Sequence, residues 1–302
     1  MKVLLCGDFD PGEEAIWRAE LEGALPQAQW LDLAAARAAP AAVEAAVVAN
    51  PPPGSLQGLP ALRLVQSLWA GVDRLLDDPT LPPGVPIARM VDPAMNAAMA
   101  ETALWAVLAL HRGFFRYLEQ QRREQWQPLP QRRADEVAVL VLGQGAMGGT
   151  VSERLRGQGY PVTGWRRSDG SAALWAALPQ AAIVINLLPL TPQTRGLLDA
   201  RFFAVMARGS CVVNLARGAH LVDADLLDAL DRGQLEHAVL DVFAVEPLPA
   251  GHPYWRHPRV TVLPHAAAAT DPRSAARVVA DNLQRLARGA PLLHLVDPRR
   301  GY

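Results

Sequence analysis

Short apolar runs alternate with turn residues and one helical pattern along residues 1–90. The runs that suit strands are 2–6, 43–49, 62–66 and 86–90, and a helical pattern at 13–22 stops at Gly23. Strand patterns that alternate with helical ones are typical of units in which the strands run parallel. The pattern therefore predicts a small α/β unit with a parallel sheet at the start of the chain.

A long helical pattern follows, from Pro93 to about residue 117. Proline suits the first turn of a helix, and apolar residues recur along this segment with helical period. These apolar positions are Ala100, Ala103, Leu104, Val107, Leu108 and Leu110. Residues 125–130 are polar and contain prolines, so we expect them to form an arm outside the core.

A second series of strand patterns begins at residue 137. Residues 137–142 are all apolar, as expected for a strand that is covered on both faces of its sheet. Further strand patterns lie at 160–165, 181–187, 210–214, 237–241 and 260–263, and a last helical pattern runs from 271 to 288. We therefore predict the α/β class, with two Rossmann-like or flavodoxin-like domains, parallel sheets and a cleft between the domains.

The length and composition narrow the class of protein further. The chain has 302 residues, enough for two domains, and its net charge of -1 gives no basis for binding nucleic acid or an anionic membrane. Cys6 and Cys211 lie in apolar runs without metal-binding spacing, so we expect two reduced thiols and no metal site. Prolines and polar residues interrupt the apolar stretch 172–190, so we expect no membrane span and a cytoplasmic protein.

The run GQGAMG at 143–148 follows an apolar strand and opens a helical pattern. In a βαβ unit this arrangement is the dinucleotide-binding fingerprint. The first glycine permits a tight turn, the second lets the backbone approach a pyrophosphate, and the third lets helix and strand pack closely. The free N–H groups of the helix start favour phosphates. The residues expected to contact the cofactor here are Gly143, Gly145, Ala146, Met147 and Gly148.

The next strand ends at Trp165 and is followed by Arg166, Arg167 and Ser168. Proteins that bind NAD usually carry Asp or Glu here, and that carboxylate binds the ribose 2′-hydroxyl. Guanidinium groups instead attract a 2′-phosphate and can hold it in a fork. We therefore predict that these four residues contact the cofactor, and that NADPH is preferred, with NADH as the alternative.

Arg217, Glu246 and His265 each come shortly after an apolar strand. Ligands of open α/β sheets bind beyond the carboxyl ends of the strands, so the three side chains could meet in one site. Arginine can bind and polarise a 2-oxo acid, and histidine can supply the proton that its keto oxygen needs when hydride arrives. A neighbouring carboxylate would orient the histidine and favour its charged form. These three are our candidate catalytic residues.

Five motifs together resemble the D-isomer-specific 2-hydroxyacid dehydrogenase family. They are GQGAMG at 143–148, INLLPLTPQTRGLL from Ile185, VNLARG at 213–218, DVFAVEPLP at 241–249 and LPHAA at 263–267. The resemblance implies a discontinuous substrate domain, residues 1–96 plus 269–302. It also implies an NADP-binding Rossmann domain, residues 97–268, with a dimerisation arm at about 112–135.

The resemblance also assigns roles to single residues. The implied substrate contacts are Trp69, Ala70, Gly71, Val72, Arg217 and His265. The further implied cofactor contacts are Leu187, Leu188, Pro189, Thr194, Leu215, Ala216, Asp241, His265 and Ala267. Relatives often have a small residue in place of Trp69, which indicates a small substrate here. Trp126 in the arm implies a homodimer in which this ring could reach the partner's active site.

Three further runs, WQPLP from Trp126, PRVT at 258–261 and the final RGY, are similar to the subgroup that reduces glyoxylate and hydroxypyruvate. We therefore expect NADPH-dependent reduction of glyoxylate to glycolate and of hydroxypyruvate to glycerate. Two alternatives stay open. The substrate could be another 2-oxo or 2-hydroxy acid, or the chain could be a non-catalytic, dinucleotide-sensing protein of the same fold.

Overall fold

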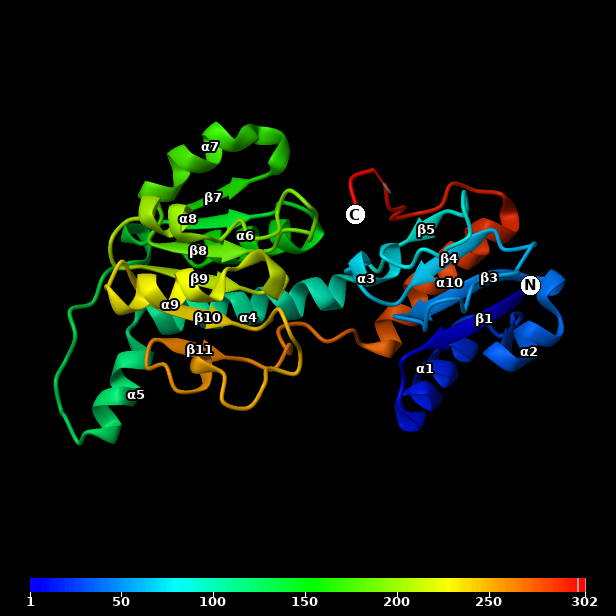
Figure 1. The fold of residues 1–302 in the computed structure, drawn as a ribbon, viewed down its shortest axis with the longest axis horizontal. Helices are drawn as coiled ribbons and strands as arrows, with labels where there is room; N and C mark the ends of the chain where they lie inside the picture. Colours follow the sequence, from blue (N-terminus) through cyan, green and yellow to red (C-terminus); the bar gives the residue numbers. More distant parts are fainter. Residues whose placement is uncertain (298, 302) are drawn as a thin grey trace. The chain divides into compact units, whose positions relative to one another are not determined.

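The computed structural model describes residues 1–297 and 299–301, so Tyr302 of the RGY run lies outside the described residues. The chain forms two compact units, residues 1–95 with 270–302 and residues 96–269. Each unit is built on its own parallel sheet (Figure 1). The predicted α/β class with two parallel sheets is confirmed.

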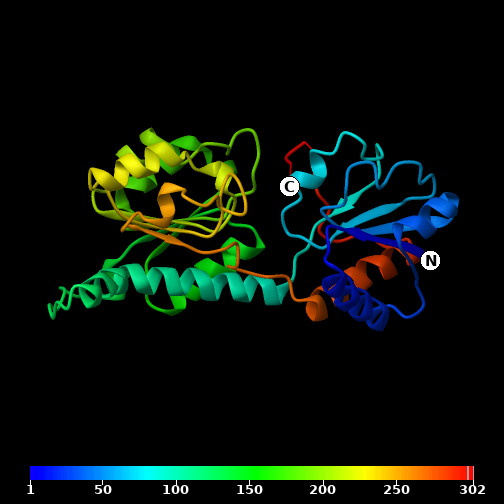
Figure 2. The same cartoon turned by 60° about the horizontal axis from the view of Figure 1, so that its bottom comes forward.

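The first unit has a five-stranded sheet in the order β2-β1-β3-β4-β5. Its strands are β1 (Lys2–Gly7), β2 (Gln29–Leu31), β3 (Val43–Ala49), β4 (Leu64–Ser67) and β5 (Ile87–Ala88). Its helices are α1 (Pro11–Ala24), α2 (Leu33–Ala38), α3 (Asp73–Leu76) and α10 (Pro272–Arg288). Helices α1 and α10 pack side by side in both views (Figures 1 and 2), which returns the end of the chain to the first unit.

Aspartates begin three of these helices. The carboxylates of Asp10, Asp32 and Asp271 accept N–H groups in the first turns of α1, α2 and α10. Each such cap satisfies a donor that the helix itself cannot pair and contributes about 1 kcal/mol. Helix α10 ends at Arg288, and the C-cap residue Gly289 has a φ of +65°, which suits glycine.

The second unit has a six-stranded sheet in the order β11-β10-β9-β8-β6-β7. Its strands are β6 (Val139–Leu142), β7 (Val162–Trp165), β8 (Ile183–Asn186), β9 (Ser210–Asn214), β10 (Leu235–Leu240) and β11 (Val260–Val262). One core contains residues of α7 (Gly170–Ala177), α8 (Ala200–Val205) and α9 (Asp223–Asp231). The other contains residues of α4 (Pro93–His111) and α6 (Ala146–Gly157). Helices therefore cover both faces of this sheet, as its apolar strands require.

The long helical pattern predicted from Pro93 is two helices. Helix α4 stops at His111, Gly113 adopts a φ of +70°, and α5 (Phe114–Arg122) follows. The apolar pattern did not reveal the break, because a single glycine is tolerated inside a helical pattern. By length and composition α4 could also cross a membrane, but Ala100, Ala103 and Val107 are buried in the core, as in a helix that covers a sheet.

Both cysteines are free and buried, as predicted. Cys6 lies in β1 and Cys211 lies in β9. Burial raises the pKa of both thiols. They are therefore protonated core residues at neutral pH.

Candidate active site

The glycines of the 143–148 loop have different surroundings. Gly143 has a φ of +92°, and a Cβ there would lie 2.5 Å from the carbonyl oxygen of Leu187. A Cβ on Gly148 would lie 1.7 Å from the carbonyl oxygen of Gly143. A Cβ on Gly145 would meet nothing within 4 Å. Gly143 and Gly148 therefore let the loop pack closely, and Gly145 leaves open space beside the start of α6.

Two positions that the sequence patterns did not single out also shape this loop. The Gln144 amide donates to the carbonyl of Val141, at 3.2 Å, and to the Ser152 hydroxyl, at 3.2 Å. A Cβ on Gly164 would lie 2.4 Å from Cδ of Gln144. Gly164 in β7 therefore makes room for the side chain that joins the loop to α6. Only the three-dimensional pairing of β6 with β7 reveals this contact.

The last residue of β7 is buried, whereas the residues that follow it are exposed. The Trp165 ring is buried in the core, and its indole N–H donates to the carbonyl of Gly170 at 3.0 Å. Arg166, Arg167 and Ser168 are exposed. The Asp169 carboxylate accepts the backbone N–H of Arg166 at 2.7 Å, and the Arg167 guanidinium donates to Gln193 at 3.2 Å. The two guanidinium groups therefore extend from the carboxyl end of β7, while Trp165 anchors the turn.

The loop after β8 is held by its own threonines. The Thr194 hydroxyl donates to the carbonyl of Pro189 at 2.8 Å and accepts the N–H of Thr191 at 2.8 Å. Leu188 and Thr194 are buried, whereas Leu187 and Pro189 are partly exposed. Thr194 thus acts within the loop and sets its shape, and Leu187 and Pro189 present the accessible surface.

Arg217 comes just after β9, on a loop that packs directly on the loop after β10. A Cβ on the neighbouring Gly218 would lie 1.8 Å from the carbonyl carbon of Phe243 and 2.3 Å from the N atom of Ala244. Leu215 and Ala216, which precede Arg217 in the same loop, are buried. The close approach of Gly218 to Phe243 and Ala244 places the loop that carries Arg217 against the loop that leads to Glu246. Sequence pattern alone does not reveal the role of Gly218, because that role depends on a loop distant in the chain.

Glu246 and His265 form a hydrogen-bonded pair. His265 Nδ1 lies 2.7 Å from Oε2 of Glu246. The other carboxylate oxygen, Oε1, accepts the N–H of Phe243 at 2.8 Å. The carboxylate is thus fixed by its own loop, while the imidazole side chain is 52% exposed. Because Nδ1 is engaged by the carboxylate, Nε2 is the ring atom free to meet a ligand.

His265 has a φ of +54°, which is uncommon for a residue other than glycine. Asp241 supports this backbone. Its carbonyl accepts the N–H of His265 at 2.9 Å, and its carboxylate accepts the N–H groups of Ala266, at 2.7 Å, and Ala267, at 3.1 Å. Burial raises the pKa of the Asp241 carboxyl, against the lowering effect of those two N–H groups. Asp241 therefore holds the strained segment that presents His265.

The predicted substrate loop, residues 69–72, lies in the first unit after β4. The N–H of Trp69 donates to the Ser67 hydroxyl at 3.0 Å, and the carbonyl of Trp69 accepts the N–H of Met90 at 3.0 Å. The Trp69 ring packs edge-on against the buried ring of Trp17, with centroids 6.1 Å apart. Ala70 and Gly71 are partly exposed and Val72 is buried. The loop is therefore anchored at Trp69 and accessible just after it.

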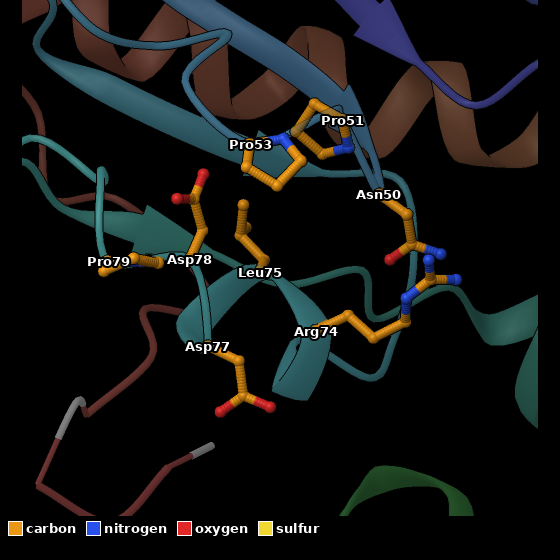
Figure 3. A pocket seen from close by; sticks show the side chains of 8 residues that line it. All are labelled: Asn50, Pro51, Pro53, Arg74, Leu75, Asp77, Asp78 and Pro79. Atoms are coloured by element: carbon orange, nitrogen blue, oxygen red, sulfur yellow. The ribbon is translucent and has the colours of Figure 1, made fainter.

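A separate pocket of about 300 Å³ lies in the first unit, at the end of β3 and beside α3. Figure 3 shows Arg74 and Asn50 at one side of it and Asp78 and Pro79 at the other. None of its lining residues is among the predicted site residues. Over residues 1–297 and 299–301, no group of three or more His, Cys, Asp and Glu residues is arranged to hold a metal ion.

Comparisons with known proteins agree on one family. Residues 104–267 match the model of the D-isomer specific 2-hydroxyacid dehydrogenase, NAD binding domain. The chain is 41% identical over 317 residues to glyoxylate/hydroxypyruvate reductase A of Serratia proteamaculans (strain 568), covering 100% of both chains. It is 42% identical over 301 residues to the protein of that name from Klebsiella pneumoniae (strain 342), covering 95% of this chain and 96% of the other.

Solved structures give the same result. A D-isomer specific 2-hydroxyacid dehydrogenase from Xanthobacter autotrophicus Py2, in complex with NADPH and MES, has a TM-score of 0.94 at 38% identity and covers 99% of this chain and 100% of its own. The NADPH-dependent glyoxylate/hydroxypyruvate reductase of Sinorhizobium meliloti, in complex with NADP and sulfate, has a TM-score of 0.92 at 34% identity, with coverages of 100% and 99%.

The chain therefore belongs to the D-isomer specific 2-hydroxyacid dehydrogenase family. It is an NAD(P)-dependent oxidoreductase, and residues 104–267 lie in its dinucleotide-binding domain.

Proposed function

We propose that the protein reduces glyoxylate to glycolate and hydroxypyruvate to glycerate with NADPH, and that His265 is the general acid. The observation that carries this proposal is the 2.7 Å contact between His265 and Glu246, because it forms the acid that the reduction of a keto group needs. The relatives that bear the name glyoxylate/hydroxypyruvate reductase A support the choice of substrates.

The residues present fit a dinucleotide phosphate. The open space at Gly145 lies at the start of α6, where unpaired N–H groups and the helix dipole favour a pyrophosphate. Arg166 and Arg167 offer two guanidinium groups for a 2′-phosphate at the end of β7. The exposed parts of Leu187 and Pro189 would border the same cofactor. When bound, the reduced nicotinamide supplies the hydride for the reaction.

The chain's own residues supply binding and the proton. The Arg217 guanidinium would bind the carboxylate of the 2-oxo acid and polarise its keto oxygen. His265 would donate the proton from Nε2 to that oxygen as it gains negative charge. Glu246 would keep the imidazole oriented and stabilise its charged form through Nδ1. Asp241 would hold the backbone at 265–267 so that the ring keeps this direction.

We also propose that backbone N–H groups of residues 70–72 bind the substrate carboxylate. Trp69, anchored on Trp17, would add bulk beside that loop and limit the size of the accepted side chain. Glyoxylate and hydroxypyruvate are small enough to satisfy such a limit. A branched oxo acid would then be a poor substrate.

A homodimer is part of the same proposal. The Trp126 side chain is 98% exposed, and Trp105, Phe114 and Leu118 are also exposed on α4 and α5. A pocket of about 310 Å³ lies beside α4, and Trp105, Leu263 and Ala266 are among its lining residues. A second copy of the chain would cover these apolar groups, and an aromatic ring of its arm could fill a pocket that borders the residue next to His265. The two free thiols suit a cytoplasmic location for this dimer.

The test is a panel of oxo acids, each assayed with NADPH and with NADH. We expect turnover of glyoxylate and hydroxypyruvate, a lower KM for NADPH than for NADH, and poor turnover of branched oxo acids. Turnover restricted to a larger oxo acid would contradict the assigned substrates. NADPH binding without turnover of any oxo acid would instead support a dinucleotide-sensing protein.

A further inference from the structure

Two adjacent strands of the second unit end in buried asparagines, and one of these, Asn186, contacts a buried histidine. Asn186 ends β8 and Asn214 ends β9, and the two residues are paired in the register of the sheet. His220 follows in a short 3-10 helix, Gly218–His220. All three side chains are at most 1% exposed, although each carries polar atoms. Buried polar groups of this kind are retained where their hydrogen bonds have a role.

The hydrogen bonds define a single protonation state for His220. The Asn186 amide nitrogen donates to Oδ1 of Asn214 at 3.0 Å and lies 2.9 Å from Nδ1 of His220. Asn186 Oδ1 accepts the N–H of Leu188, which fixes the orientation of the amide. Nδ1 of His220 must therefore accept. Nε2 lies 3.3 Å from a carbonyl oxygen, that of Pro189, so it must carry the proton.

The same network reaches two loops that belong to different parts of the proposed site. Through Asn186 and His220 it holds the N–H of Leu188 and the carbonyl of Pro189, in the loop proposed to border the cofactor. Through Asn214 it holds the N–H of Ala216, at 3.3 Å, and the carbonyl of Arg217, at 3.0 Å. The His220 side chain is fully buried, so it acts on the loop at 187–189 through the backbone carbonyl of Pro189.

We propose that His220 is a positioning residue that keeps the cofactor loop at 187–189 and the segment of Arg217 in register, through a neutral imidazole protonated on Nε2. The proposal rests on the proposed function. Removal of His220 should therefore weaken the binding of both the dinucleotide and the oxo acid. A side chain that only fills space would affect the stability of the fold and neither affinity.

Three variants separate these roles. His220→Leu keeps much of the volume but removes both hydrogen-bonding atoms. His220→Gln restores one acceptor and one donor in a single side chain, so it can bond to Asn186 and to the carbonyl of Pro189. His237→Leu is the matched control, because His237 is also a buried histidine of this sheet but bonds to Thr261, away from both loops.

The measurements are Tm, the Kd for NADPH by fluorescence titration, and kcat and KM with glyoxylate. We expect His220→Leu to raise both the Kd and the KM and to lower kcat/KM by about 10²-fold, the loss typical of a displacement of about 1 Å at a site. His220→Gln should recover part of both affinities. His237→Leu should lower Tm without changing them. A folded His220→Leu protein with wild-type Kd and KM would overturn the proposal.

Nitrogen NMR of histidine-labelled protein gives a second test that needs no turnover. We expect the signal that disappears in His220→Gln to be that of a neutral ring protonated on Nε2. A ring protonated on Nδ1, or on both nitrogens, at neutral pH would contradict the network. Because the NADPH titration and this spectrum do not depend on catalysis, they remain decisive for His220 even if the protein reduces neither glyoxylate nor hydroxypyruvate.

Discussion

Gly218→Ala should separate the two loops that carry Arg217 and Glu246. The added Cβ would lie 1.8 Å from the carbonyl carbon of Phe243, whereas carbon atoms in contact are about 3.5–4.0 Å apart. The obstacle is backbone on both sides, so no side chain can rotate away. The loops must therefore move apart by at least about 1.7 Å, the difference between the shorter contact distance and the distance in this structure.

The cost should appear in both stability and catalysis. Overpacking of this kind usually destabilises a fold by about 1–3 kcal/mol. A displacement of this size at a catalytic group is expected to lower kcat/KM by about 10²-fold or more. Urea unfolding measures the first effect, and the decrease of NADPH absorbance with glyoxylate measures the second.

Gly157→Ala is the matched control, because it places the same methyl group at the end of α6, where a Cβ meets nothing within 4 Å. It should leave kcat/KM unchanged. If Gly218→Ala folds and retains the wild-type kcat/KM, the close contact of the two loops does not position the catalytic groups and our reasoning about this site is wrong.

Three further predictions concern separate parts of the molecule. Replacement of Arg166 and Arg167 by Ala should raise the KM for NADPH by about tenfold or more, with little change for NADH, because charged hydrogen bonds to a phosphate are lost. An equal change for both cofactors would contradict this. Trp126→Ala should weaken the dimer, measured by light scattering against dilution, without changing the Tm of the monomer; an unchanged mass at every concentration would exclude a role in the interface. Burial, with smaller effects of His257 and Arg259, lowers the pKa of His237 from 6.5 to about 4, so the unfolded chain takes up this proton first. The free energy of unfolding should therefore be unaffected by His237 above pH 6.5 and fall by up to about 3 kcal/mol as the pH approaches 4. Urea unfolding at several pH values measures this loss, which should be smaller in His237→Leu.

The sequence patterns predicted the buried strands well, because their apolar runs are continuous. The bounds of β3 and β9 agree with prediction, and the other core strands differ by a few residues at their ends. The edge strand β2 and the following helix α2 were missed. Gln29–Leu31 is too short to show a period, and the alanine-rich α2 shows no contrast between its faces.

In the candidate active site, sequence pattern predicted which strand ends meet but not the contacts between distant segments. Strand order brings Glu246 and His265 to adjacent strand ends, so a parallel sheet alone predicts that they can meet. The contacts of Gly218, Gly164 and His220 were not predicted, because each depends on a residue from another segment that local pattern cannot pair with it. Trp165 illustrates the same limit, since its position at the end of a strand gave no sign that its ring would be buried in the core.

The role of His265 is tested by measuring kcat with glyoxylate and Kd for NADPH on the same preparation of His265→Ala. We expect kcat to fall by about 10²–10⁴-fold, as for the loss of a general acid, while the Kd for NADPH stays close to that of the wild type. A folded variant that keeps nearly full turnover would show that the pair formed by His265 and Glu246 does not supply the proton.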